Sequence, residues 1–196
     1  MKHSEALAIA ESKVELLRPH CTKIDIAGSI RRLKLDVKDI EIVCLPQEFK
    51  ARLYIRNNLF EGGSVTPNFA DTIYSLGLPV KGQPNGKYMQ IASHEGINLD
   101  LFMPDDFDYY RQFAIRTGSA EYAMKVIAAG WRKIGWCGSD KGLRKVSDCV
   151  EKKDKNGKSS WRCVNLDAEL PPVWESEQEF FAWLGVKWIE PQYRNY

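Results

Sequence analysis

The chain has 196 residues, of which 44% are hydrophobic and 28% charged, and its formal net charge is +2 at pH 7. This apolar content is sufficient for a packed core, so the composition argues against a disordered chain. No apolar run reaches the length of a membrane span, and residues 1–20 lack the apolar core of a signal peptide. We therefore expect a soluble, intracellular protein without a membrane partner.

Helices and short strands follow one another in the first half of the chain. Apolar residues at helical spacing predict a first helix that Ser4 caps and Pro19 ends, and two further helices over Gln47–Phe60 and Pro67–Leu76. Short apolar runs between turn residues predict four strands, Lys23–Ala27, Asp39–Leu45, Lys87–Ala92 and Ile97–Met103. A hairpin of the last two strands would bring Ile97–Met103 beside Asp39–Leu45 in a mixed sheet, with helices covering one face.

The sequence predicts a boundary between two lobes at Pro104-Asp105-Asp106. Beyond it, Asp106–Ile115 has a helical pattern, and Ser119 caps a helix that runs to Ala129 with Gly130 at its C-terminal end. We therefore expect an α+β protein with a larger domain over residues 1–104 and a small α/β lobe over residues 105–196.

The C-terminal lobe is expected to be rich in β-structure. Its clearest part is a hairpin from Ser147 to Val164 that turns at Asn156-Gly157, and the capping box Ser176–Glu179 begins a last short helix. The segment from Lys125 to Lys158 contains ten Lys or Arg residues and four Asp or Glu residues, which gives it a local net charge of +6. Such a patch fits either a solvated hairpin surface or a phosphate backbone as partner.

Five cysteines occur in the chain without any Cys-x-x-Cys pair. An odd number without such pairs argues against a disulfide framework and against a zinc ribbon. Cys137, Cys149 and Cys163 have the chemistry to share a metal ion, but we expect ordinary core or surface thiols there.

The densest group of reactive side chains lies in residues 27–45, AGSIRRLKLDVKDIEIVCL. Asp39 and Glu41 are two residues apart in an apolar run, so on a strand both carboxylates project from the same face. Two carboxylates on one strand form a hard oxygen site suited to Mg²⁺. This pattern predicts a metal site on the strand Asp39–Leu45.

A phosphate-binding turn is predicted just upstream of these carboxylates. Gly28 and Ser29 offer backbone N–H groups and a hydroxyl, and Arg31 and Arg32 can fork onto phosphate oxygens. A turn for phosphate beside a strand for metal is the arrangement that nucleotidyl transfer requires.

These residues resemble the GS-x-R-R … D-x-[DE] signature of the nucleotidyltransferase fold, and most closely that of the family X DNA polymerases, the group that contains polymerase beta. Three further landmarks are similar: Asp100 in INLDLFM, the segment IRTGS, and the tail SEQEFFAWLGVKWIEPQYRNY. The resemblance implies a catalytic palm over residues 1–104, with a mixed sheet backed by helices. It also implies a C-terminal lobe over residues 105–196 that binds the nascent base pair.

The resemblance also implies roles for individual side chains. Asp39 and Glu41 would ligate two Mg²⁺ ions, and Asp100 would ligate the ion beside the primer end and accept the hydroxyl proton. Gly28, Ser29 and Arg32 would grip the triphosphate of a dNTP. A plain tight turn with solvated arginines is the simpler alternative for those three residues.

Further positions match the family segments that contact the sugar and the primer. Thr117-Gly118-Ser119 would lie beside the incoming sugar with a cis Gly118–Ser119 bond, although simple capping by Ser119 explains these residues as well. Lys81 and Lys87 would contact primer phosphates, or else be solvated lysines.

The chain also departs from the family pattern. Glu41 stands where the family has a second aspartate, which implies low activity or a preference for Mn²⁺. Ile115-Arg116 replaces the usual Tyr-Phe, so the barrier to a ribose 2′-hydroxyl is altered. Ala120, Ala123 and Ile127 occupy helix positions that touch the nascent base pair in the family, and they cannot hydrogen-bond a base.

Together these features predict a minimal family X-like DNA polymerase, similar to compact viral members. The segment before Gly28 is too short for the family's lyase and helix-hairpin-helix regions. We expect a monomer that adds nucleotides to a primer 3′-hydroxyl at short gaps in a DNA duplex, in the cytoplasm or, for a viral protein, in the infected cell or virion. The alternatives are a template-independent or other nucleotidyltransferase, and a catalytically weak module that binds DNA ends.

Overall fold

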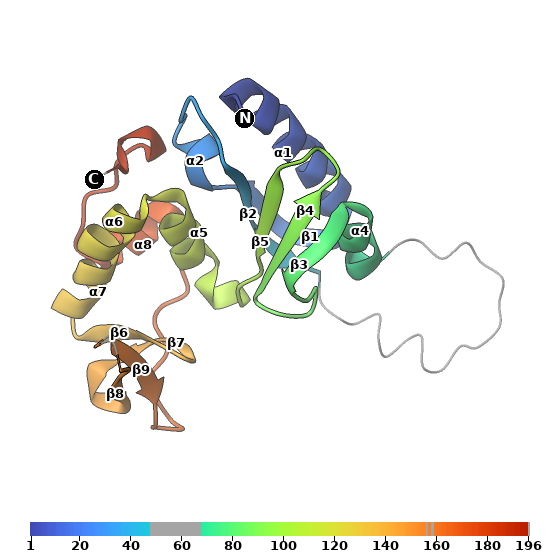
Figure 1. Ribbon diagram of the computed structural model, residues 1–196. Coiled ribbons are helices and arrows are strands. Elements are labelled where there is room, and N and C mark those ends of the chain that lie inside the picture. The colour runs from blue at the N-terminus through green and yellow to red at the C-terminus, as the bar shows by residue number, and fades with distance from the viewer. Residues whose placement is uncertain (48–67, 156, 158, 196) are drawn as a thin grey trace, which may run out of the picture. The chain divides into compact units, whose positions relative to one another are not determined.

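The computed structural model describes residues 1–47, 68–155, 157 and 159–195 (Figure 1). The chain divides into two compact units, Met1–Tyr109 and Tyr110–Tyr196. Each unit holds one mixed sheet together with helices, so the protein is α+β. A helix was predicted over Gln47–Phe60, and all of its residues after Gln47 lie outside the described part of the chain.

The first unit is built on a five-stranded sheet of order β1-β2-β5-β4-β3. Only β2 and β5 run parallel, and the other neighbours are antiparallel. The predicted hairpin β4–β5 is present, and it places β5 beside β2. The strands are β1 (Cys21–Ile26), β2 (Asp39–Pro46), β3 (Gly77–Gly82), β4 (Tyr88–Ser93) and β5 (Asn98–Phe102).

Strand β3 was not predicted from the sequence, which indicated a helix end at Gly77 and a turn at Gly82. The strand contains Pro79, a residue that usually argues against a strand because it has no N–H to donate. It is tolerated here because, among the described residues, β3 lies at the edge of the sheet and pairs with β4 alone.

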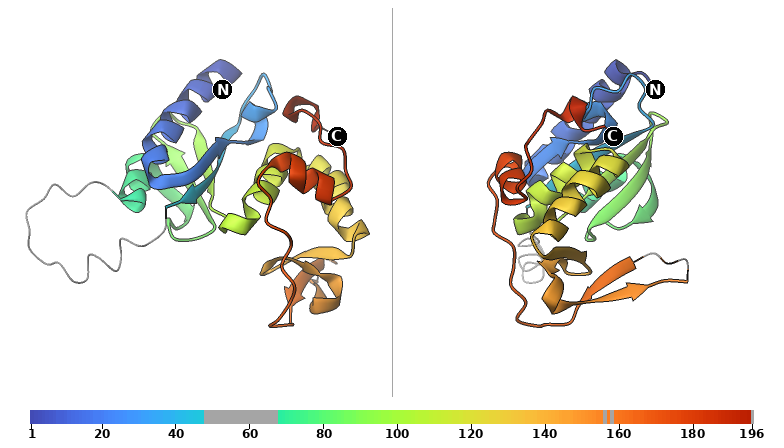
Figure 2. Two further views of the ribbon diagram at one scale, coloured as in Figure 1. Left: turned by 180° about the vertical axis from the view of Figure 1, so that it is seen from behind. Right: turned by 90° about the vertical axis from the view of Figure 1, so that its left-hand side faces the viewer.

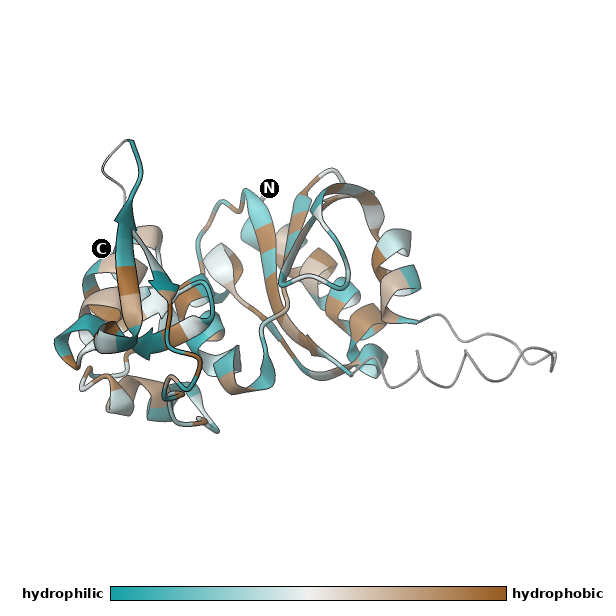
Figure 3. Cartoon of the chain, turned by 90° about the horizontal axis from the view of Figure 1, so that it is seen from below, coloured by the Kyte–Doolittle hydropathy of each residue, from teal (hydrophilic) through white to brown (hydrophobic). Residues whose placement is uncertain are grey.

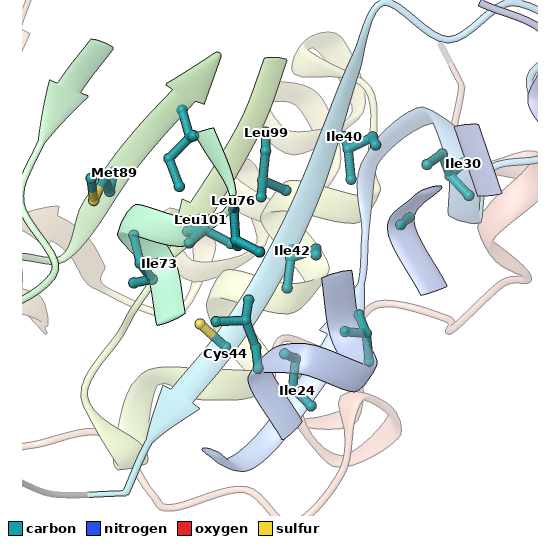
Figure 4. Close-up of a cluster of buried hydrophobic side chains, with 14 of the residues drawn as sticks. Ile24, Ile30, Ile40, Ile42, Cys44, Ile73, Leu76, Met89, Leu99 and Leu101 are labelled. Atoms are coloured by element: carbon teal, nitrogen blue, oxygen red, sulfur yellow. The ribbon is translucent and has the colours of Figure 1, made fainter. Parts of the chain in front are cut away.

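Helices cover one face of this sheet. Helix α1 (His3–Leu17) and helix α4 (Phe69–Ser75) lie on the same side, as the views from front and back show (Figures 1 and 2). The short helices η1 (Arg18–His20) and α2 (Gly28–Arg31) precede and follow β1. Figure 4 shows Ile40, Ile42, Leu99 and Leu101 projecting from neighbouring strands into the apolar cluster, where all four are fully buried.

Alternation along the strands separates this core from a polar face. The teal and brown bands along the strands in Figure 3 reflect that alternation. Since Ile40, Ile42, Leu99 and Leu101 belong to the core, their sequence neighbours project from the opposite face. The polar residues on that face include Asp39 and Glu41 of β2, Asp100 of β5, and Tyr88 and Gln90 of β4.

The second unit combines helices with a four-stranded sheet of order β7-β6-β9-β8. After η2 (Asp106–Asp108) and α5 (Tyr109–Thr117), the chain forms α6 (Ala120–Tyr122), η3 (Ala123–Ala128) and α7 (Ala129–Lys133). The remaining elements are β6 (Trp136–Ser139), β7 (Gly142–Lys145), η4 (Val146–Asp148), β8 (Cys149–Lys153), β9 (Ser159–Cys163), α8 (Glu177–Trp183) and η5 (Pro191–Tyr193).

Aromatic side chains form much of the core of the second unit. Trp136 and Trp183 make an edge contact at 5.4 Å between ring centroids, and Trp174 contacts Phe180 at 4.9 Å. The predicted hairpin corresponds to the antiparallel pair β8–β9. The predicted last helix corresponds to α8, whose N-cap Ser176 accepts a hydrogen bond from the backbone N–H of Glu179.

The prediction that Gly130 ends its helix was wrong. The helical segment continues through Gly130 to Lys133. Gly130 is buried, and a Cβ there would come within 3.2 Å of Val186 Cγ2 and 3.3 Å of Leu184 Cβ. The glycine therefore serves close packing against the segment after α8 rather than helix termination.

Candidate functional site

Two neighbouring parallel strands bring the three predicted carboxylates onto one face of the first unit. Glu41 of β2 is the register partner of Asp100 on β5, and Asp39 is the partner of Asn98. All three carboxylates belong to the polar face opposite α1 and α4. The residues predicted from two separate sequence segments therefore lie side by side.

The pKa of Asp39 is shifted by its burial and by its charged neighbours. Burial raises the pKa of Asp39, and the negative charge of Asp100 raises it further, whereas the Arg32 guanidinium opposes the shift. Like charges in a partly buried site repel, and a bound cation would remove that repulsion. A positive charge nearby, such as that of Arg32, favours the ionised form of Asp39.

Asp100 is held by two hydrogen-bond donors from the adjacent strand. Tyr88 Oη donates to Asp100 Oδ1 at 2.8 Å, and Gln90 Nε2 donates to the same oxygen at 2.9 Å. The side chain of Asp100 is only 9% exposed, so these contacts satisfy a carboxylate that water scarcely reaches. Tyr88 and Gln90 were not predicted as site residues, although their alternation with Met89 and Ile91 places them on the same face of the sheet as Asp100.

The predicted phosphate turn is a short helix, α2, that packs against β2. Its first residue, Gly28, has φ +64°, and the Ala27 N–H before it donates to the Glu41 carbonyl at 2.8 Å. A Cβ at residue 28 would overlap Glu41 Oε2. Gly28 is therefore required by its backbone conformation and by the Glu41 side chain that lies against it.

Ser29 and Arg32 sit at the same turn. Within the described part of the chain, no group hydrogen-bonds the buried Ser29 Oγ. Burial lowers the pKa of Arg32, while the nearby charges of Glu41 and Asp39 oppose this shift. A buried hydroxyl without a partner is uncommon in proteins, and a water or ligand oxygen could supply the missing hydrogen bond.

The donor set at this face fits a divalent cation in its chemistry, because carboxylate oxygens are the ligands that Mg²⁺ prefers. The present side-chain positions do not complete such a site. Among the described residues, no group of three or more His, Cys, Asp or Glu side chains is arranged to hold a metal ion. The contact of Glu41 with Gly28 is one reason, since it directs that carboxylate toward the turn.

The two predicted primer-contacting lysines lie in the same unit, and both are exposed. Lys87 donates to Asp105 Oδ2 at 2.7 Å, so its charge already has an acidic neighbour. Lys81 is on the edge strand β3, opposite Gln90 of β4.

In the second unit, Thr117, Gly118 and Ser119 join helices α5 and α6. Ser119 is the N-cap of α6, and its side chain accepts a hydrogen bond from the Tyr122 N–H at 3.1 Å. The described residues contain no cis peptide bond, so the expected cis Gly118–Ser119 bond was wrong. The capping interaction explains Ser119, and its own N–H donates to the Arg194 carbonyl at 2.9 Å.

The helix residues expected near a nascent base pair differ in exposure. Ala120 is exposed and Ala123 is half-buried, as are Ile115 and Arg116. Ile127, by contrast, is fully buried in the aromatic core, so it cannot contact a base. Its burial agrees with the expectation that Ile127 makes no hydrogen bond to a base.

Three of the five free cysteines lie together in the small sheet of the second unit. Cys149 on β8 is the register partner of Cys163 on β9. Burial raises the pKa of the Cys137 thiol on β6 to about 12, and its contact with the Cys149 thiol adds to the shift. Buried thiols with raised pKa values are unreactive, in line with the expectation of ordinary core or surface thiols.

A comparison with protein families finds a similarity in the second unit. Residues 113–195 match the family model described as the DNA polymerase beta thumb. The match supports a relationship to polymerase beta and a polymerase-like, DNA-binding function. It covers the thumb region alone and leaves out residues 1–112, which hold the carboxylates. No curated protein sequence matches the chain.

Across the described ranges, every helix is too short or too polar to cross a lipid bilayer.

Proposed function

We propose that the protein is a DNA polymerase of the family X type, with residues 1–104 as its catalytic palm and residues 105–196 as its nascent-base-pair lobe. The observation that carries this proposal is the shared face of Asp39, Glu41 and Asp100 on the adjacent strands β2 and β5. The thumb match over residues 113–195 gives independent support for a DNA substrate.

The carboxylates would hold two divalent cations, Mg²⁺ or Mn²⁺, which supply charge neutralisation for the triphosphate when bound. Asp100 would accept the proton of the primer 3′-hydroxyl. The negative charges of Asp39 and Glu41 would hold the cations beside Asp100. Phosphoryl transfer depends mainly on positioning and charge, so a rigid pair of strands is a suitable scaffold.

The turn at α2 would bind the triphosphate of the incoming dNTP. Ser29 Oγ is the buried hydroxyl that lacks a partner in the described chain, and a phosphate oxygen would provide one. Arg32 would bring a positive charge that Glu41 and Asp39 already attract. Thr117, Gly118 and Ser119 would lie beside the sugar, and Lys81 and Lys87 would contact the DNA backbone without reading sequence.

The test is extension of a labelled primer across a one-nucleotide gap, with each dNTP and rNTP offered singly in Mg²⁺ and then in Mn²⁺. We expect templated addition of one nucleotide that disappears in Asp100→Ala. Because Ile115 and Arg116 alter the expected sugar barrier, the rNTP reactions measure sugar selectivity. Equal addition of all four nucleotides to a single-stranded primer would instead identify a terminal transferase.

A second function, binding of DNA ends with weak catalysis, is favoured by the position of Glu41. Its carboxylate lies against Gly28 rather than together with Asp39 and Asp100 in a metal-holding group. One additional methylene, compared with an aspartate, moves a bridging ligand by a distance that catalysis tolerates poorly. Tight binding of the gapped duplex without extension in either metal would establish this function. Extension gained in Glu41→Asp would show that the glutamate is the cause.

A further inference from the structure

The environment of Asp100 is asymmetric. Tyr88 and Gln90 are alternate residues on β4, and both donate to Oδ1, so Oδ2 receives neither hydrogen bond. Gln90 is the register partner of Asp100, and Tyr88 is the partner of Phe102. The two donors therefore come from fixed positions on a strand that is itself inside the sheet.

The Tyr88 ring is also held in place. It packs against Phe102 with 5.2 Å between ring centroids and a tilt of 32° between the planes. The hydroxyl can thus reach Asp100 from a ring that has little freedom to turn. Two donors on one oxygen fix the rotation of the carboxylate, because any large rotation would break both bonds.

We propose that Tyr88 and Gln90 are positioning residues that hold Asp100 with Oδ2 presented to a divalent cation. This inference rests on the proposed function, because it assigns Asp100 as the cation ligand. Donors behind a metal ligand orient it, and their loss typically weakens metal affinity or activity by roughly 10–100-fold.

The first variant is Tyr88→Phe, which removes only the hydroxyl and retains the ring that packs on Phe102. The second is Gln90→Met, which preserves length without a donor. Tyr74→Phe is the matched control, since Tyr74 belongs to the same unit and is exposed at 51%. It makes the same chemical change away from the polar face.

Binding of Mn²⁺ to the full chain, without DNA or nucleotide, is measured from the electron paramagnetic resonance signal of the free ion. We expect Tyr88→Phe and Gln90→Met each to weaken the binding by about tenfold. The double variant should weaken it further, and Tyr74→Phe should leave it unchanged. In gap filling, kcat should fall by a similar factor while KM for the dNTP changes by less than about twofold.

The outcomes separate this inference from the function on which it rests. If wild type binds Mn²⁺ through Asp100 and the double variant binds it equally well, the positioning role is overturned while the polymerase assignment stands. If Tyr74→Phe weakens binding as much as Tyr88→Phe, the effect is not positional, and the inference is again overturned. If wild type neither binds Mn²⁺ nor extends a primer, both proposals fail together.

Discussion

Glu41 Oε2 occupies the space that a side chain at residue 28 would need. The two residues belong to separate elements, β2 and α2, and the Ala27 N–H links the elements through its hydrogen bond to the Glu41 carbonyl. The turn proposed to bind phosphate therefore packs directly against the strand proposed to bind metal. A substitution in one should change the structure of the other.

Gly28→Ala should consequently lower both stability and activity. The alanine would have to adopt φ +64°, which costs roughly 1–2 kcal/mol, and it would displace the Glu41 carboxylate. Gly96→Ala is the control, since Gly96 has φ +78° but no atom within 4 Å of its added Cβ. Urea unfolding should show a larger loss for Gly28→Ala than for Gly96→Ala, and equal losses would contradict the packing argument.

Removal of the charge at Asp100 should change the titration of Asp39. Because the Asp100 charge is the second cause of the raised pKa of Asp39, Asp100→Asn should move that pKa down toward the ordinary value. Burial, the largest cause, would remain, so the return should be incomplete. The measurement is a carboxyl ¹³C NMR titration without divalent ions, and an unchanged Asp39 would show that the two charges do not interact.

The same raised pKa of Asp39 sets the sign of a pH effect on stability. A carboxyl whose pKa is raised in the folded state binds its proton more tightly there than in the unfolded chain. Its contribution is therefore present below the ordinary aspartate pKa and is lost as pH rises through the raised value. Asp39→Asn should reduce this loss in metal-free thermal unfolding as the pH rises above about 4.

Ser29→Ala should separate ligand binding from stability. The alanine removes a buried hydroxyl that has no partner within the described chain, so thermal stability should be unchanged or slightly higher. If the hydroxyl binds a triphosphate oxygen, KM for the dNTP should rise roughly 10–100-fold, as for a hydrogen bond to a charged group. Ser75→Ala, whose exposed hydroxyl donates to the Thr72 carbonyl, should leave KM unchanged.

Arg194 and Glu177 form a buried ion pair in the region that matches the polymerase beta thumb. Arg194 is 0% exposed and binds both Glu177 oxygens, at 2.6 and 2.8 Å, and Trp188 Nε1 donates to Glu177 Oε2 at 3.0 Å. Arg194→Met would leave a buried carboxylate without its cation, which should cost about 3–5 kcal/mol of unfolding free energy.

Two comparisons test this prediction for the buried pair. The double variant Arg194→Met with Glu177→Gln removes both charges and should recover part of the lost stability. Lys125→Met breaks the exposed pair with Glu121 and should cost less than about 1 kcal/mol. Similar losses for Arg194→Met and Lys125→Met in chemical denaturation would show that the buried pair contributes no more than a surface pair.

The sequence by itself determined which side chains share a face. Asp39 and Glu41 alternate with Ile40 and Ile42, and this period of two is enough to place both carboxylates opposite the core. The N-caps Ser119 and Ser176 were also predictable, because capping is a local hydrogen bond between a side chain and a nearby N–H.

Only the tertiary structure decided how separate segments meet. The pairing of Glu41 with Asp100, the two donors from β4 to Asp100 and the contact between Glu41 and Gly28 all join residues distant in the chain. The same holds for Gly130, whose close contact with Leu184 and Val186 overrides its tendency to end a helix. Local patterns specify the direction of a side chain, whereas its neighbours depend on strand order and register, which the packing of the whole unit determines.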